Sequence, residues 1–156
     1  MIGATTALTS AHLPPEWAER IYGDPAAVTG GFAMPVGTGR RVAGGGLVVN
    51  GRWAWGAGTH HCTWIGGGVL VEGEGAPFVF FERDQVQILD TWHVAGLRGT
   101  GSNDYEVVDA LVPEGRWVHI GAEPVVDGAV YRLPFLGMLA LGVCSVALGL
   151  ARRAQA

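Results

Sequence analysis

Residues 64–81 read WIGGGVLVEGEGAPFVFF, two short apolar runs joined by a glycine-rich segment. Short runs rich in Val, Ile, Phe and Trp, bounded by glycine turns, are typical of β-strands. Comparable runs recur between residues 28 and 117, at 30–34, 46–49, 64–71, 78–81 and 105–112. The pattern predicts a mainly β protein built on a compact antiparallel sheet or barrel.

Two turn signals lie early in this β-rich region. The triplet Gly44–Gly46 separates Arg40–Val42 from Leu47–Val49, and the pair Asn50-Gly51 follows directly. Glycine and asparagine tolerate the positive φ angles that tight hairpin turns require. The sequence therefore predicts two hairpins in succession.

Helices are predicted at the two ends of the chain. Pro14–Tyr22 begins with two prolines and places Trp17 and Ile21 one turn apart, as in a short helix. Leu133–Ala151 is uncharged and long enough to cross a membrane. Its small residues and Pro134 equally suit a helix buried in a helical bundle. The residues alone leave both interpretations open.

The composition narrows the classes of function. A chain of 156 residues predicts one main domain, and a charged share of 15% predicts that a missing partner or domain covers part of the surface. The net charge of -4, with only ten Lys plus Arg, provides no basic stripe for nucleic acid. Cys62 and Cys144 stand far apart, which indicates a reducing cytoplasm, and Met1–Leu13 lacks the pattern of a signal peptide.

One segment combines aromatic side chains with bare backbone. Asn50–His61 contains Trp53 and Trp55, followed by Gly56 and Gly58. Aromatic faces and accessible backbone donors suit a planar heterocyclic ligand. Two tryptophans on one face of a strand could equally fill the hydrophobic core. The segment is therefore a candidate binding site, and the alternative is that both tryptophans only pack in the core.

Two further segments carry weaker signals. His60, His61 and Cys62 include metal-ligand types, but adjacent histidines on a strand point to opposite faces and no carboxylate is near, so no metal site is predicted. The loop Gly96–Asp104 either offers backbone N–H groups to an anion beside Arg98 or forms an ordinary tight turn. No G-x-S-x-G motif occurs, and no residue is assigned a catalytic role.

Two motifs in order carry a family resemblance. Gly51-Arg52-Trp53-x-Trp55-x-x-Gly58 is followed by DTWHVAGLRGTGSND at residues 90–104 and by Val112-Pro113-Glu114. Together they resemble the acyl-CoA dehydrogenase superfamily, and most closely its flavin-dependent two-component monooxygenases, the aromatic and steroid-phenol hydroxylases. The similarity extends from about Leu13 to the end of the chain.

The resemblance implies three parts. Residues 1–24 correspond to the remnant of an amino-terminal helical domain, residues 25–120 to a central antiparallel β-barrel that contacts flavin, and residues 121–156 to a linker and the first helix of a truncated carboxyl-terminal bundle. The implied cofactor is FMN or FAD. The implied partners are a flavin reductase and either further copies of the chain or a companion chain that supplies helices, with no role for nucleic acid or a membrane.

The same resemblance implies which positions contact flavin. They form a strand and a turn: Phe32, Ala33, Met34 and Pro35, then Trp55, Gly56, Ala57 and Gly58. Many relatives carry a hydroxyl at position 57, and alanine cannot donate that hydrogen bond. The residues that act on substrate lie in domains outside this chain, so the expected function is the flavin-binding portion of a hydroxylase, incomplete by itself. The alternatives are a non-catalytic β-barrel that serves as an interaction module and a tail-anchored membrane protein.

Overall fold

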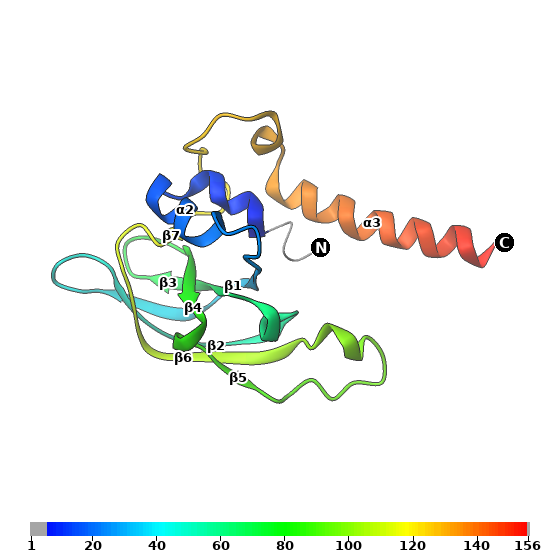
Figure 1. Ribbon diagram of the computed structural model, residues 1–156, viewed down its shortest axis with the longest axis horizontal. Helices are drawn as coiled ribbons and strands as arrows, with labels where there is room; N and C mark the ends of the chain where they lie inside the picture. The colour runs from blue at the N-terminus through cyan, green and yellow to red at the C-terminus, as the bar shows by residue number, and fades with distance from the viewer. Residues whose placement is uncertain (1–5, 156) are drawn as a thin grey trace.

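The computed structural model describes residues 6–155 and shows a β-sheet with helices above it and a long helix that projects away (Figure 1). Residues 1–5 and 156, the outer ends of the predicted parts 1–24 and 121–156, lie outside the described residues. The α-helices and 3-10 helices are η1 (Leu8–His12), α2 (Pro15–Tyr22), η2 (Thr59–His61), η3 (Arg83–Gln85), η4 (Arg98–Thr100), η5 (Ala129–Arg132) and α3 (Phe135–Ala154). The strands are β1 (Thr29–Arg41), β2 (Leu47–Gly56), β3 (Trp64–Val71), β4 (Phe78–Glu82), β5 (Gln87–Leu89), β6 (Asn103–Val112) and β7 (Trp117–Val118).

The predicted antiparallel β-barrel is wrong. The described strands form one open sheet of seven strands in the order β5-β6-β2-β1-β3-β4-β7. A barrel requires its two outermost strands to pair, whereas β5 and β7 are very short and lie at opposite edges. The sheet is also mixed, because β3 pairs with β1 in the parallel direction while the other pairs are antiparallel.

The first predicted hairpin is confirmed and the second is wrong. β1 and β2 pair as far as Arg41 and Leu47, and the glycine triplet between them has φ angles of 90–91°. Asn50 and Gly51 instead lie within β2, at a register shift against β6. There the Asn50 amide donates to the Asp109 carboxylate and accepts the Asp109 N–H, at 3.0 and 2.9 Å. These bonds satisfy polar groups at a bulge, so no turn forms.

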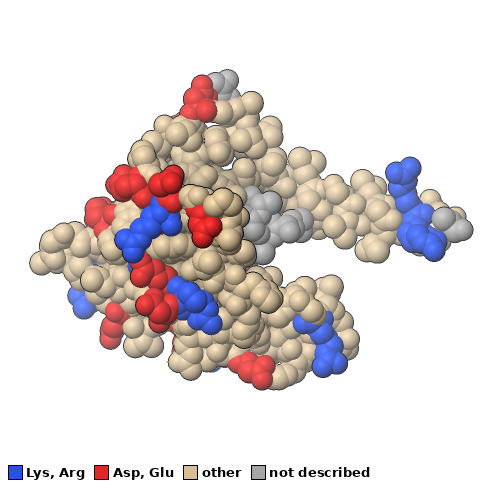
Figure 2. All heavy atoms as spheres, in the orientation of Figure 1, with Lys and Arg blue, Asp and Glu red and all other residues tan. Residues whose placement is uncertain are grey.

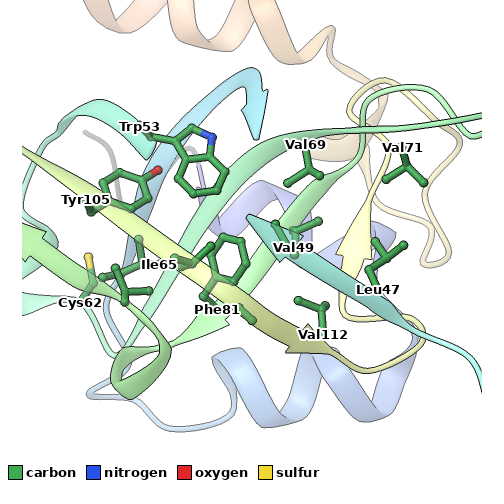
Figure 3. Packing of buried hydrophobic residues seen from close by; sticks show 14 residues of the cluster. Leu47, Val49, Trp53, Cys62, Ile65, Val69, Val71, Phe81, Tyr105 and Val112 are labelled. Atoms are coloured by element: carbon green, nitrogen blue, oxygen red, sulfur yellow. The ribbon is translucent and has the colours of Figure 1, made fainter. Parts of the chain in front are cut away.

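The core is organised around Trp53, which is 0% exposed. Its indole lies in a slot between three glycines: a Cβ added at Gly37, Gly51 or Gly67 would approach the ring to 2.5–2.6 Å. The ring lies beside Tyr105 (Figure 3) and stacks on it with 5.4 Å between centroids. Its Nε1 donates to the Gly68 carbonyl at 2.9 Å. The glycine-rich composition therefore makes room for one large side chain as well as for turns.

Both faces of strand β4 are buried, which explains its continuous apolar sequence. Val79 and Phe81 point into the cluster around Trp53, whereas Phe78 and Phe80 pack with α2 residues such as Ile21. This division follows the two-residue period of a strand. The short amino-terminal helix predicted at residues 14–22 thus exists as α2 and covers one face of the sheet.

Candidate functional site

The structure brings the two predicted segments together. Phe32–Pro35 lies in β1 where the pairing with β3 shifts register, and Trp55–Gly58 lies at the end of β2 and in the turn after it. The rings of Phe32 and Trp55 meet edge to face, with centroids 6.0 Å apart and planes at 84°. An aromatic corner therefore forms between segments that are far apart in the sequence.

Trp55 and Trp53 do not share a face, contrary to the structural alternative considered for them. Trp55 is 63% exposed and has a left-handed φ of 63°. A left-handed conformation costs a side-chain-bearing residue about 1–2 kcal/mol, so the surrounding structure must hold it in place. Strained residues of this kind cluster at ligand-binding sites. The exposed indole, which also meets Phe32 of the other predicted segment, therefore marks a candidate binding surface.

Tyr105 fixes the backbone of the site strand, which is the segment Phe32–Pro35 of β1. Its hydroxyl accepts the Phe32 N–H at 2.8 Å and donates to the Gly66 carbonyl at 2.6 Å. Burial is the main cause that raises the pKa of Tyr105, so the hydroxyl stays neutral and keeps both bonds. Gly31, with a φ of 138°, passes so close to Gly66 that no side chain fits between them.

The turn after Trp55 is held by backbone contacts. Ala57 N–H donates to the Trp55 carbonyl at 2.8 Å, and Gly58 N–H donates to the Thr100 carbonyl at 2.9 Å. Gly58 has a φ of 73°, which glycine adopts without strain. Burial raises the pKa of the nearby Cys62 thiol, so this thiol is poorly suited to act as a nucleophile.

An apolar pocket of about 320 Å³ extends from the site strand toward α3. Phe32, Ala33 and Met34 form one wall of it, and Phe135 and Leu139 from α3 form part of the other. Pro35 and the turn Trp55–Gly58 do not line this pocket. Three of the eight predicted residues therefore form a pocket wall and four form a neighbouring turn, which meets the wall at Phe32, while Pro35 belongs to neither group.

Sequence reasoning missed Tyr105 and Asn103 as supports of the site. Asn103 accepts two backbone N–H groups and donates toward His60, at the edge of the turn. Asn103 falls within the motif at residues 90–104. The motif therefore identified the right region but did not indicate what Asn103 does. The adjacent histidines His60 and His61 lie on helix η2, not on a strand. Within residues 6–155 no group of three His, Cys, Asp or Glu side chains could hold a metal ion.

Charged side chains are concentrated on the sheet and α2, and helix α3 carries them only near its end (Figure 2). Arg152 and Arg153 lie in the last turn of α3. By length and composition this helix could cross a membrane, with a mean hydropathy of 1.9, and none of that window is buried. Buried core helices of soluble proteins meet the same length and hydropathy criteria, so α3 alone does not define a membrane protein.

The open bulged sheet, with an aromatic corner between β1 and β2, matches the fold of flavin-dependent monooxygenases of known structure. A crystal structure of the HsaA monooxygenase from Mycobacterium tuberculosis aligns with a TM-score of 0.64 and 33% identity, over 74% of this chain and 34% of that chain. XiaF from a Streptomyces species, in complex with FADH2 and glycerol, aligns with a TM-score of 0.66 and 26% identity, over 83% of this chain and 32% of that chain.

Sequence comparison gives the same class of relatives. The chain is 37% identical over 153 residues to a pigment production hydroxylase from a Rhodococcus species, covering 89% of this chain and 39% of the relative. It is 34% identical over 151 residues to the oxygenase subunit HsaA of a flavin-dependent monooxygenase from M. tuberculosis, covering 88% and 38%. No protein-family model matches. The chain thus has flavin-dependent monooxygenase oxygenase subunits as homologues and spans about two fifths of their length.

Proposed function

We propose that this chain is the flavin-contacting portion of a two-component monooxygenase of the acyl-CoA dehydrogenase superfamily. The observation that carries the proposal is the exposed, strained Trp55 packed edge to face against Phe32. The relatives support it, because their names describe oxygenase subunits and hydroxylases and one solved neighbour holds FADH2. Two other relatives are named as an indole-3-acetate monooxygenase and a p-hydroxyphenylacetate 3-hydroxylase, which supports an aromatic compound as the substrate class.

The residues present fit a planar heterocycle. Phe32, Ala33 and Met34 offer an apolar wall, and Trp55 offers an aromatic surface near the partly exposed backbone of Gly58. The departure at Ala57 means that this turn can approach a ligand through main-chain groups but not through a side-chain hydroxyl. When bound, reduced flavin supplies the electrons that an oxygen-inserting reaction requires. The chain itself binds and orients the ring and excludes water from one side of it.

The rest of the enzyme is part of the same proposal. Residues 1–24 are the end of an amino-terminal helical domain, 25–120 the flavin-contacting sheet domain, and 121–156 a linker with the first bundle helix. A flavin reductase delivers reduced flavin, and further helices from another copy or a companion chain complete the cleft in the cytoplasm. The unburied surface of α3 supports this, because an apolar helix of this length is normally covered in a soluble protein.

The proposal is tested by titrating the purified chain with FMN and with FAD while flavin fluorescence is followed. A sizing column gives the oligomeric state of the same sample. We expect micromolar binding in a defined oligomer. Trp55→Ala should then weaken binding about two- to tenfold, since one aromatic contact contributes about 0.5–1.5 kcal/mol. Leu111→Ala, which removes an exposed side chain at the far end of β6, is the control and should bind like the parent chain. An absence of binding at high flavin concentration would leave a non-catalytic module.

The position of α3 in the assembly can be tested separately. If α3 is a bundle helix, the chain should remain in the aqueous phase of a detergent partition experiment, as an oligomer. Leu141→Glu, at an exposed apolar position of α3, should then shift the chain toward monomer on a sizing column. Partition of the parent chain into the detergent phase would instead support a membrane-anchored protein.

A further inference from the structure

We propose that His60 and Asn103 form a polar latch that holds the flavin-contacting turn in its strained conformation. The proposal rests on the proposed function only for the identity of the ligand. The latch itself is defined by hydrogen bonds between η2, which follows the turn, and the start of β6.

The orientation of the Asn103 amide is fixed by its surroundings. The residue is only 7% exposed, and its Oδ1 accepts the backbone N–H groups of Thr91 and Trp92 at 3.0 and 2.9 Å. Only the oxygen of an amide can accept two such bonds. The Nδ2 group is therefore directed to the other side, where it lies 3.0 Å from Nε2 of His60.

The amide orientation determines the state of His60. An amide nitrogen donates and does not accept, so Nε2 of His60 must be the acceptor. The imidazole is then neutral and carries its proton on Nδ1, the less common tautomer of an unconstrained histidine. Within residues 6–155 Nδ1 has no hydrogen-bond partner, so a donor remains available at the edge of the turn.

The hydrogen bond between His60 and Asn103 contributes a free energy similar to the strain at Trp55. The left-handed conformation of Trp55 costs about 1–2 kcal/mol, and one hydrogen bond contributes about 0.5–1.5 kcal/mol net. The turn is tied to the start of β6 and the loop before it by the pairing of Gly56 with Asn103, by Gly58 N–H on the Thr100 carbonyl and by His60 on the Asn103 side chain. Loss of this last bond removes an amount comparable to the strain, so Trp55 would relax toward other conformations.

The tautomer gives a test that needs no flavin. In the full chain, long-range proton–nitrogen NMR should show His60 with a protonated Nδ1 and an unprotonated Nε2. Asn103→Asp keeps an acceptor for Thr91 and Trp92 but removes the donor, so Nε2 of His60 should become protonated. A parent chain in which Nε2 already carries the proton would overturn the latch.

Flavin titration tests the positioning role. His60→Ala should weaken flavin binding about fivefold, as the loss of one net hydrogen bond implies. His60→Gln, whose side-chain oxygen can accept from Asn103, should restore binding to within about twofold. Equal binding by His60→Ala and the parent would overturn the positioning role. If the parent chain binds no flavin, the proposed function fails, while the NMR signals of His60 and the amide shifts of residues 55–58 in His60→Ala still decide whether the latch holds the turn.

Discussion

Replacing Trp53 with alanine is expected to lower the free energy of unfolding by about 3–5 kcal/mol, the range for truncation of a fully buried aromatic side chain. The indole is completely buried between three glycines, and these residues have no side chains that could move in to fill the space. The substitution also removes the stacking on Tyr105 and leaves the Gly68 carbonyl without its donor. Urea denaturation followed by circular dichroism measures the loss.

Trp55→Ala is the matched comparison for this experiment. It removes the same side chain two residues away, but from a position that is 63% exposed. We expect a change in the free energy of unfolding below about 1 kcal/mol, within the range of surface substitutions. Similar losses for the two variants would contradict the assignment of Trp53 to the core and Trp55 to the site.

Tyr105→Phe is expected to lower the free energy of unfolding by about 1–3 kcal/mol although only one oxygen atom is removed. The hydroxyl joins the Phe32 N–H of β1 to the Gly66 carbonyl of β3, and both groups lose a partner where water has little access. Because one of these groups belongs to the site strand, flavin binding should weaken in the same variant. Denaturation and flavin titration on the same preparation measure the two effects.

A control for Tyr105→Phe is Tyr131→Phe, which removes a hydroxyl from a partly exposed tyrosine in η5, away from the sheet. This variant should unfold like the parent chain. If Tyr105→Phe also left stability and flavin binding unchanged, the hydroxyl would not be the support that the geometry indicates.

The apolar runs predicted the strands well because burial of one or both faces of a strand determines which of its residues are apolar. The run at 64–71 coincides with β3, and the helix predicted at 14–22 begins one residue later as α2. Closure of the sheet was predicted wrongly because it depends on whether β5 and β7 meet, and no local pattern specifies that pairing.

Both errors near the site arise from features that the local pattern of residues does not show. A strand of strict two-residue period would place Trp53 and Trp55 on one face, but the left-handed backbone of Trp55 redirects its side chain. Asn50-Gly51 looks like a turn until the bonds to Asp109 on β6 are known. The first error comes from one backbone dihedral angle, and the second comes from a hydrogen-bonding partner far away in the sequence. The eight flavin-contact positions remain a prediction, although the structure brings Phe32 and Trp55 together.

The slot around Trp53 constrains how this sequence can change over evolutionary time. A methyl group at Gly37, Gly51 or Gly67 would overlap the indole, while a smaller ring at position 53 would leave an empty space between them. Neither change is tolerated alone, yet the two together restore the occupied volume. We therefore expect these four positions to change together and not singly, since a substitution at one of them requires a compensating change at another.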